Sequence, residues 1–346
     1  MSPARRLTLV VPSGLEAPTG GNRYDAALAR ALEGLGVAVD RRSAAGRWPL
    51  GTAADRERLA GLLAGPDPVL ADGLVACAAP DVVAGAVAAG TPVHVLVHLP
   101  LALETGYAPE RRATLDALER AALDAATGVV ATSRWAAAHL RRHHGLAAVA
   151  VATPGTDAAP PAAGSTPPRL LQLASVVPRK DQLGVVAALA PVRDLAWTAE
   201  LAGALDLDPA YVARVRDAIG THGLGDRVRL TGPLAGAGLA AAWDAADLVL
   251  LPSHAETWGM AVTEGLARGV PAVVGRGTGA EEALGRTADG VVPGAVVPPG
   301  DPAALAAAVR DLLGPGRERA LTAAKARRDT LGSWRDTARD VLAAIP

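Results

Sequence analysis

The chain has 346 residues, about twice the length of an ordinary domain, and half of them are hydrophobic, enough for two buried cores. Its formal net charge of −1 gives no basic excess that would favour nucleic acid or an acidic membrane surface. Cys77 is the only cysteine, which excludes a disulfide within the chain and is typical of a reducing compartment. We therefore expect a cytoplasmic protein of two domains that does not bind nucleic acid.

The first half of the chain alternates short apolar runs with alanine-rich segments of helical length. Runs that are apolar throughout indicate strands covered on both faces, and their alternation with helices predicts a parallel, doubly wound α/β sheet. The expected strands are residues 7–12, 37–40, 68–70, 93–99, 128–132 and 147–152. The expected helices are residues 23–35, 55–63, 80–89, 110–125 and 134–143.

One stretch of this half, residues 82–103, lacks Asp, Glu, Lys and Arg and is long enough to cross a bilayer. It is interrupted by Gly85, Gly90 and Pro92, so we interpret it as a helix, a turn and a buried strand. No transmembrane segment is expected, and peripheral contact with a membrane stays open.

A segment rich in Pro, Ala, Gly and Ser, residues 157–169, is expected to link two domains. The strand pattern then restarts at 169–175, 198–203, 227–232, 247–252, 271–275 and 294–297. Helices are expected at 209–219, 239–245, 260–268, 302–313, 317–330 and 333–344. We predict an N-terminal domain of residues 1–160, a C-terminal domain of residues 161–330, and a C-terminal helix, 331–346, that could pack back on the N-terminal domain. Ligands of such sheets bind beyond the carboxyl ends of the strands.

Two glutamates lie close to the expected start of one helix of the second half. Glu256 is in the loop after a buried strand, and Glu264 is in the first turns of the helix that follows. Carboxylates accept hydrogen bonds from sugar hydroxyls, and unpaired amides at a helix start bind phosphate oxygens. These amides belong to Gly259, Met260 and Ala261. The alternative is an acidic first turn that the helix dipole favours.

Arg179 and Lys180 lie where the first strand of the second half passes into a helix. Two cations there can neutralise a pyrophosphate leaving group as negative charge develops on it. The alternative is a solvated helix start with two surface cations, which the helix dipole would oppose. Lys180 is one of only two lysines in a chain that otherwise uses arginine.

Two features of the first half could also touch a ligand. Gly14, Gly20 and Gly21 follow the first expected strand and precede a helix, so their loop can lie against phosphate or sugar; a flexible turn is the alternative. His98 ends the buried strand 93–99, where a lone histidine is more often structural.

No metal site is expected. Asp206 and Asp208 form a D-x-D string, but Asp208 followed by Pro209 is typical of a helix N-cap with proline at the first helical position. Cysteine and histidine show no zinc spacing, and residues 141–144 are expected to be a solvated helix end.

The two glutamates, with seven residues between them and A-x-G-x-P after the second, resemble retaining glycosyltransferases of family 4, the group 1 glycosyltransferases. The resemblance implies a GT-B fold, in which two Rossmann-like domains face each other across a cleft. It implies that Glu256 contacts the donor sugar and that Glu264 contacts the nucleotide ribose. Lys180 matches the lysine of the family's G-R-x-x-P-x-K-G segment, whereas the family's arginine falls on Ser175, a departure that Arg179 could compensate.

The resemblance covers nearly the whole chain. Gly20 and Gly21 resemble the family's Gly-Gly loop, and His98 matches a family histidine that faces the donor. It implies an acceptor-side N-terminal domain and a donor-binding C-terminal domain. The implied reaction transfers a hexose-type sugar, with retention, from a UDP- or GDP-sugar to a small-molecule, glycan or lipid acceptor. It needs neither a cofactor nor a metal.

Three other functions stay open. A sugar-nucleotide 2-epimerase has a similar architecture, although the glutamate pair argues against it. A non-catalytic nucleotide-sugar binder stays open because Ser175 replaces the family's arginine. A nicotinamide-dependent oxidoreductase is disfavoured because no G-x-G-x-x-G is present.

Overall fold

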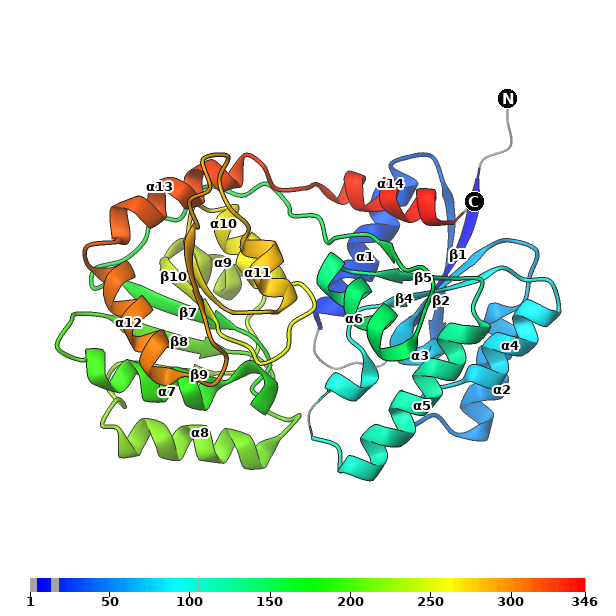
Figure 1. The fold of residues 1–346 in the computed structure, drawn as a ribbon, viewed down its shortest axis with the longest axis horizontal. Coiled ribbons are helices and arrows are strands. Elements are labelled where there is room, and N and C mark those ends of the chain that lie inside the picture. The colour runs from blue at the N-terminus through cyan, green and yellow to red at the C-terminus, as the bar shows by residue number, and fades with distance from the viewer. Residues whose placement is uncertain (1–4, 14–18, 105, 346) are drawn as a thin grey trace. The chain divides into compact units, whose positions relative to one another are not determined.

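The computed structural model describes residues 5–13, 19–104 and 106–345, and the statements below concern these residues. Contacts divide the chain into two compact units. Unit 1 comprises Met1–Gly155 and Gly332–Pro346, and unit 2 comprises Thr156–Leu331. Each unit is a parallel α/β sheet with helices on both faces, which confirms the predicted fold class (Figure 1).

The described part of unit 1 has a six-stranded parallel sheet in the order β2-β1-β3-β4-β5-β6. Its strands are β1 (Arg6–Pro12), β2 (Ala38–Ala44), β3 (Val69–Asp72), β4 (Val93–Val97), β5 (Gly128–Ala131) and β6 (Ala150–Val151). Its helices are α1 (Gly20–Glu33), α2 (Ala53–Leu63), α3 (Gly73–Ala76), α4 (Pro80–Ala88), α5 (Pro109–Ala125), α6 (Arg134–His144) and α14 (Trp334–Ala344), with the 3-10 turn η1 (Leu101–Leu103). The strand order reverses between β1 and β3.

Unit 2 has a second six-stranded parallel sheet, in the order β12-β11-β10-β7-β8-β9. Its strands are β7 (Arg169–Leu173), β8 (Thr198–Ala202), β9 (Val228–Thr231), β10 (Ala246–Leu251), β11 (Ala272–Gly275) and β12 (Gly294–Val297). Its helices are α7 (Gln182–Leu189), α8 (Pro209–Thr221), α9 (Gly236–Asp244), α10 (Met260–Leu266), α11 (Gly279–Leu284), α12 (Pro302–Leu313) and α13 (Arg317–Arg328), with the 3-10 turns η2 (Pro178–Lys180) and η3 (Ala190–Val192). Here the order reverses between β7 and β10.

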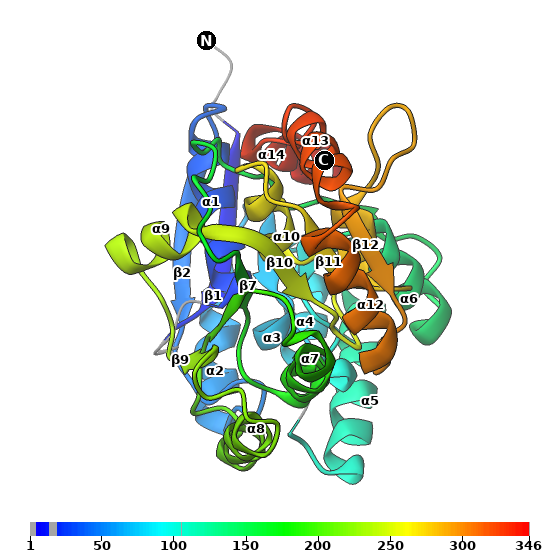
Figure 2. The ribbon, with the colours of Figure 1, turned by 90° about the vertical axis from the view of Figure 1, so that its left-hand side faces the viewer.

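Each sheet carries an apolar cluster on both faces, which is why its central strands are apolar throughout. In unit 1, Leu9 packs with residues of α1 and α14, and the next residue, Val10, packs with residues of α2 to α6. In unit 2, one cluster joins the sheet to α7, α8 and α12 and the other joins it to α9, α10, α11 and α13. Figure 2 shows unit 2 facing the viewer, with α7, α8 and α12 labelled. Trp197 and Trp243 are buried, one in each of these clusters.

The last helix of the chain, α14, belongs to unit 1. It lies beside α1, and the ring of Trp334 meets that of Tyr24 edge-on, with centroids 5.4 Å apart (Figure 1). The Thr337 hydroxyl donates to the carbonyl of Thr153 at 2.7 Å. Val341 is fully buried in the cluster on this face of the sheet.

The expected linker, residues 157–169, is not a free connection. It forms no helix before β7, but Gly164 N donates to Asp244 O at 2.9 Å, and Ser165 N donates to the carboxylate of Asp247 at 3.0 Å. Arg328 also donates to Ala159 O at 2.7 Å. These bonds tie the segment to unit 2, so the boundary between the units falls at residues 155 and 156 rather than at 160.

Some elements differ from their expected bounds. α1 begins at Gly20, three residues early, because the Thr19 hydroxyl caps it by accepting from Asn22 N at 3.2 Å. Gly20 and Gly21 therefore form the first turn of a helix and not the loop before it; Gly14, expected in the same loop, lies outside the described residues. β2 extends to Ala44, beyond the expected end at residue 40. It is an exposed edge strand, so its polar residues do not form the apolar run from which strands were predicted.

Residues 82–103 fold as most of α4, a turn, β4 and the 3-10 turn η1, as interpreted from the sequence. Among the residues that the structure describes, no helix is both long and apolar enough to pass through a bilayer. Asp208 caps α8 through Tyr211 N at 2.9 Å, with Pro209 at the first helical position, which confirms the cap interpretation of the D-x-D string.

Candidate functional site

The loops after β7 and β10 carry most of the predicted site residues of unit 2. These strands are parallel neighbours, so their carboxyl ends lie at the same edge of the sheet. This is also where the strand order reverses, the place at which doubly wound sheets bind ligands. The first loop brings Ser175, Arg179 and Lys180 to this edge, and the second brings Ser253 and Glu256.

Lys180 and Glu256 form an ion pair between the two loops. The ammonium of Lys180 donates to Glu256 Oε2, and the Ser253 hydroxyl donates to the same oxygen at 3.4 Å. The two charged side chains are only 14% and 9% exposed. Burial raises the pKa of Glu256, but the positive charges of Lys180 and Arg179 outweigh it and hold this pKa below its usual value. Glu256 is therefore ionised at neutral pH and acts only as an acceptor.

Arg179 holds the backbone of the second loop. Its guanidinium donates to Ala255 O at 3.2 Å, and its own carbonyl accepts from His254 N at 2.9 Å. These two bonds hold the backbone of His254 and Ala255, the two residues before Glu256, so Arg179 positions the loop as well as adding positive charge beside the carboxylate. It lies on the short 3-10 turn η2 that ends at Lys180.

Two buried glutamines hold the first loop, and the sequence interpretation missed both. Gln172, in β7, donates to Lys180 O at 2.8 Å, and Gln182, in α7, donates to Ser175 O at 3.0 Å. They span the loop from strand to helix and fix its path past the ion pair. A polar residue inside the apolar strand RLLQL was the available signal for Gln172.

Glycines hold the loop that carries Glu256 by close backbone packing. Gly279 N donates to Glu256 O at 2.6 Å, and a Cβ at Gly279 would lie 1.8 Å from Thr257 O. Gly259 has a φ of +90°, and a Cβ there would lie 2.9 Å from Leu251 Cδ2. This backbone conformation and packing require glycine at position 259 without any ligand.

Gly259 caps α10, whose first residues are Met260 and Ala261, so their amides have no acceptor within the helix. Glu264 lies in the second turn of the same helix and is partly buried. Its carbonyl accepts from Arg268 at 2.8 Å. Helix geometry therefore fixes the backbone that carries the Glu264 carboxylate.

The turn before α11 and the first residues of that helix have a structural role, as their hydrogen bonds show. The carboxylate of Glu281 accepts from Gly277 N at 2.8 Å and so closes the turn before the helix. Thr278 donates its hydroxyl to Gly275 O at 2.8 Å. This turn presents Gly279 to the loop that carries Glu256.

His98 lies in a carboxylate cluster at the carboxyl edge of unit 1. Its Nε2 is 2.9 Å from Asp25 Oδ1 and 3.6 Å from Asp72 Oδ2. Asp72 ends β3 and also accepts from Leu74 N at 2.6 Å. Gly21 packs against the histidine, since a Cβ there would lie 3.0 Å from His98 Cδ2. Gly21 thus contacts a predicted site residue from the first turn of α1.

The carboxylates decide the charge of His98. Burial lowers the pKa of His98, but Asp25 and then Asp72 raise it by more, to about 9. Burial and the charge of Asp25 raise the pKa of Asp72 to about 7, against the opposing charge of His98. At neutral pH His98 is therefore an imidazolium, which donates from both nitrogens and cannot act as a base. Neither aspartate was expected from the sequence, although an acidic residue at the end of a buried strand is a signal for Asp72.

Replacing Asp25 with Asn should lower the pKa of His98 from near 9 towards its ordinary value, because it removes the largest charge that raises it. NMR titration of ¹⁵N-labelled imidazoles measures this directly, with His98→Gln identifying the signal. In the wild type, raising the pH from 6.5 to 9 should also reduce the free energy of unfolding, since the folded state retains a proton that the unfolded state loses. A wild-type His98 that titrates near 6.5 would contradict this arrangement.

Comparisons with known proteins give the family. The family described as "Glycosyl transferases group 1" matches residues 156–329, half of the chain. Two curated relatives are D-inositol 3-phosphate glycosyltransferases. That of Salinispora tropica is 36% identical over 121 residues, 35% of this chain and 24% of the relative. That of Kineococcus radiotolerans is 35% identical over 140 residues, 38% of this chain and 32% of the relative. The matched segments thus span about a quarter to a third of these relatives.

Solved structures share the fold along the whole chain. Anabaena HepE in complex with UDP and glucose has a TM-score of 0.75 at 18% identity, covering 97% of this chain and 98% of that one. Sucrose-phosphate synthase from Thermosynechococcus elongatus has a TM-score of 0.76 at 22% identity, covering 98% of both. The architecture is therefore the predicted GT-B fold. With the family match to unit 2, the chain belongs to the group 1 glycosyltransferases.

Proposed function

We propose that this protein transfers a sugar from a nucleotide diphosphate donor to an acceptor, with the donor bound at the carboxyl edge of unit 2. The observation that carries this proposal is the buried ion pair of Lys180 and Glu256 at the reversal of strand order. Family membership supports the chemistry. The relatives named as glycosyltransferases also support the chemistry. The HepE structures with UDP and with UDP-glucose support the class of donor.

In the proposed complex, Lys180 binds the diphosphate. An ammonium has three N–H groups, so it can donate hydrogen bonds to diphosphate oxygens as well as to Glu256, and the diphosphate adds negative charge beside this largely buried cation. As the bond from the anomeric carbon to the phosphate oxygen breaks, negative charge grows on that oxygen. Lys180 stabilises this charge in surroundings from which water is largely excluded. The amides of Met260 and Ala261 are proposed as further donors to the phosphates.

The glutamates then have separate roles. Glu256, held ionised by Lys180 and Arg179, accepts from hydroxyls of the donor sugar, which we propose to be a hexose. Glu264, on α10, accepts from the ribose hydroxyls. Because a helix fixes the backbone of Glu264, it suits the rigid part of the donor, which is the nucleoside.

We further propose retention of anomeric configuration by front-face attack, without a metal. The acceptor oxygen forms its bond to the anomeric carbon on the face that the diphosphate leaves, and the acceptor proton passes to the departing phosphate. Glu256 is already engaged with Lys180 and Ser253, which disfavours it as a covalent nucleophile. Unit 1 is proposed to bind the acceptor, with the His98 imidazolium as a hydrogen-bond donor. The names of the curated relatives make an inositol phosphate the first acceptor to test.

Lys180→Met should lower turnover by about 100- to 1000-fold, the usual cost of removing a group that stabilises charge in the transition state. Release of UDP or GDP from a panel of nucleotide sugars, with and without acceptors and in excess EDTA, measures it. Lys325→Met is the matched control, since it removes the other lysine, which is exposed on α13. Wild-type turnover in Lys180→Met would contradict the proposal. An altered sugar formed without acceptor would indicate an epimerase.

Calorimetric titration should separate the two glutamates. A hydrogen bond to a charged group contributes about 1.5–3 kcal/mol, so each loss should cost roughly 10- to 150-fold in affinity. Glu264→Ala should weaken binding of the bare nucleoside diphosphate and of the nucleotide sugar alike. Glu256→Gln should weaken only the nucleotide sugar and should depress turnover. Equal weakening of the bare diphosphate by both substitutions would show that these roles are wrongly assigned.

A further inference from the structure

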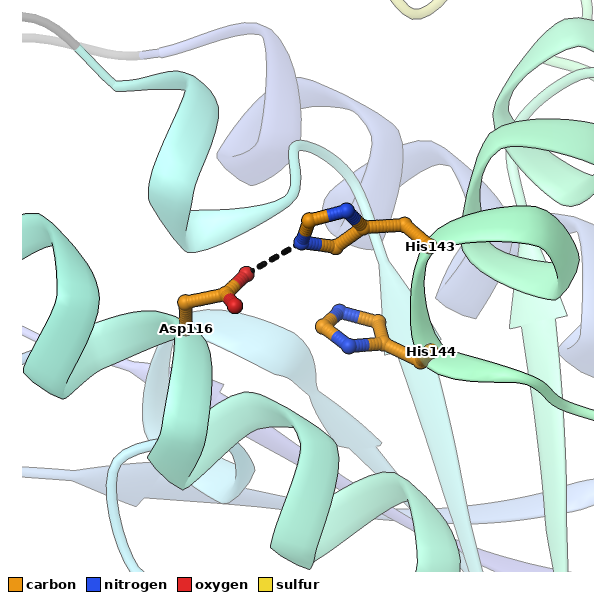
Figure 3. A group of neighbouring side chains, drawn as sticks. All are labelled: Asp116, His143 and His144. Atoms are coloured by element: carbon orange, nitrogen blue, oxygen red, sulfur yellow. Dashed lines mark hydrogen bonds and ion pairs between the residues drawn. The ribbon is translucent and has the colours of Figure 1, made fainter.

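A second group of ligating side chains lies between α5 and the last turn of α6. Asp116, His143 and His144 offer a carboxylate oxygen and two imidazole nitrogens that lie within 4.8 Å of one another (Figure 3). The group shares no residue with the cluster of His98, Asp25 and Asp72.

The expected solvated helix end is confirmed for residues 141–143, which are exposed, but not for His144, which is buried. The Nε2 of His144 lies 3.0 Å from Glu119 Oε2 on α5. The other oxygen of Glu119 accepts from Leu101 N at 3.1 Å, so this carboxylate is fixed on both sides. His143 Nε2 lies 2.6 Å from Asp116 Oδ1, with both side chains partly exposed.

One ring nitrogen of His144 lacks a hydrogen-bond partner in the described part of the chain. With its Nε2 proton donated to Glu119, its lone pair is on Nδ1, and this buried atom has no hydrogen-bond partner in the described part of the chain. A buried nitrogen without a partner is costly in a protein interior. A carboxylate behind a histidine is also the arrangement that fixes the tautomer and orientation of histidines that bind metals.

We propose that Asp116, His143 and His144 bind a divalent transition-metal ion such as Zn²⁺, with Glu119 positioning His144. Two imidazoles and one carboxylate are ligands that zinc accepts, and bonds of about 2.0–2.2 Å place tetrahedral ligands about 3.3–3.6 Å apart. Side-chain rotations bring the group to that spacing. The exposed side of His143 and Asp116 leaves the fourth position to water. The ion joins α5 to α6 and strengthens unit 1, away from the proposed donor edge of unit 2.

The test uses untagged, metal-free protein titrated with Zn²⁺ and with Co²⁺. We expect one ion per chain by calorimetry, visible d–d absorption bands with Co²⁺, and a higher melting temperature with Zn²⁺. His143→Asn should abolish the Co²⁺ bands and weaken Zn²⁺ binding at least tenfold; this position is 43% exposed, so the variant should fold. Glu119→Gln should weaken Zn²⁺ binding about 10- to 100-fold without removing a ligand.

His222→Asn, which removes an exposed histidine from unit 2, is the matched control and should bind Zn²⁺ as the wild type does. Absence of stoichiometric binding, or equal binding by the wild type and His143→Asn, would overturn the proposal. Equal losses in His143→Asn and His222→Asn would overturn it too, since they would indicate scattered surface binding. Because the readouts are metal binding and stability, failure here leaves the proposed sugar transfer untouched.

Discussion

A largely buried ammonium and a buried carboxylate meet where the strand order of unit 2 reverses, and the candidate site is organised around that contact. Taking charges out of water is costly, and pairing them in a close contact offsets part of that cost. The charges of Lys180 and Arg179 lower the pKa of Glu256. The pair therefore places a cation and an anion where little water reaches, as the proposed binding of a diphosphate and a sugar requires.

The surrounding structure holds the two loops in the one position where this contact forms. Gln172 and Gln182 fix the first loop, and the guanidinium of Arg179 crosses to the second. Gly279 allows the second loop to pack directly on the start of α11. In unit 1, too, a charged group is stabilised by groups of opposite charge at the carboxyl edge of the sheet. There Asp25 and Asp72 raise the pKa of His98 and keep it cationic.

The sequence predicted the two doubly wound sheets because strands covered on both faces are apolar throughout, and this signal is local. It also placed Glu256, Glu264 and Lys180 on loops and helix starts, since these positions follow strands. It could not predict contacts between distant segments: nothing near His98 indicates Asp25, and nothing near His144 indicates Glu119. The helix start at Gly20 was missed because Thr19 caps two glycines that, read alone, suggest a loop.

In the proposed complex, a nucleotide diphosphate sugar binds where the loops after β7 and β10 meet. Hydrogen–deuterium exchange with and without UDP- and GDP-sugars tests this position, because it reports which backbone segments a ligand protects. We expect slower exchange in peptides that cover residues 174–184 and 252–266 with at least one of these donors. A donor that binds and leaves both segments unprotected would contradict it.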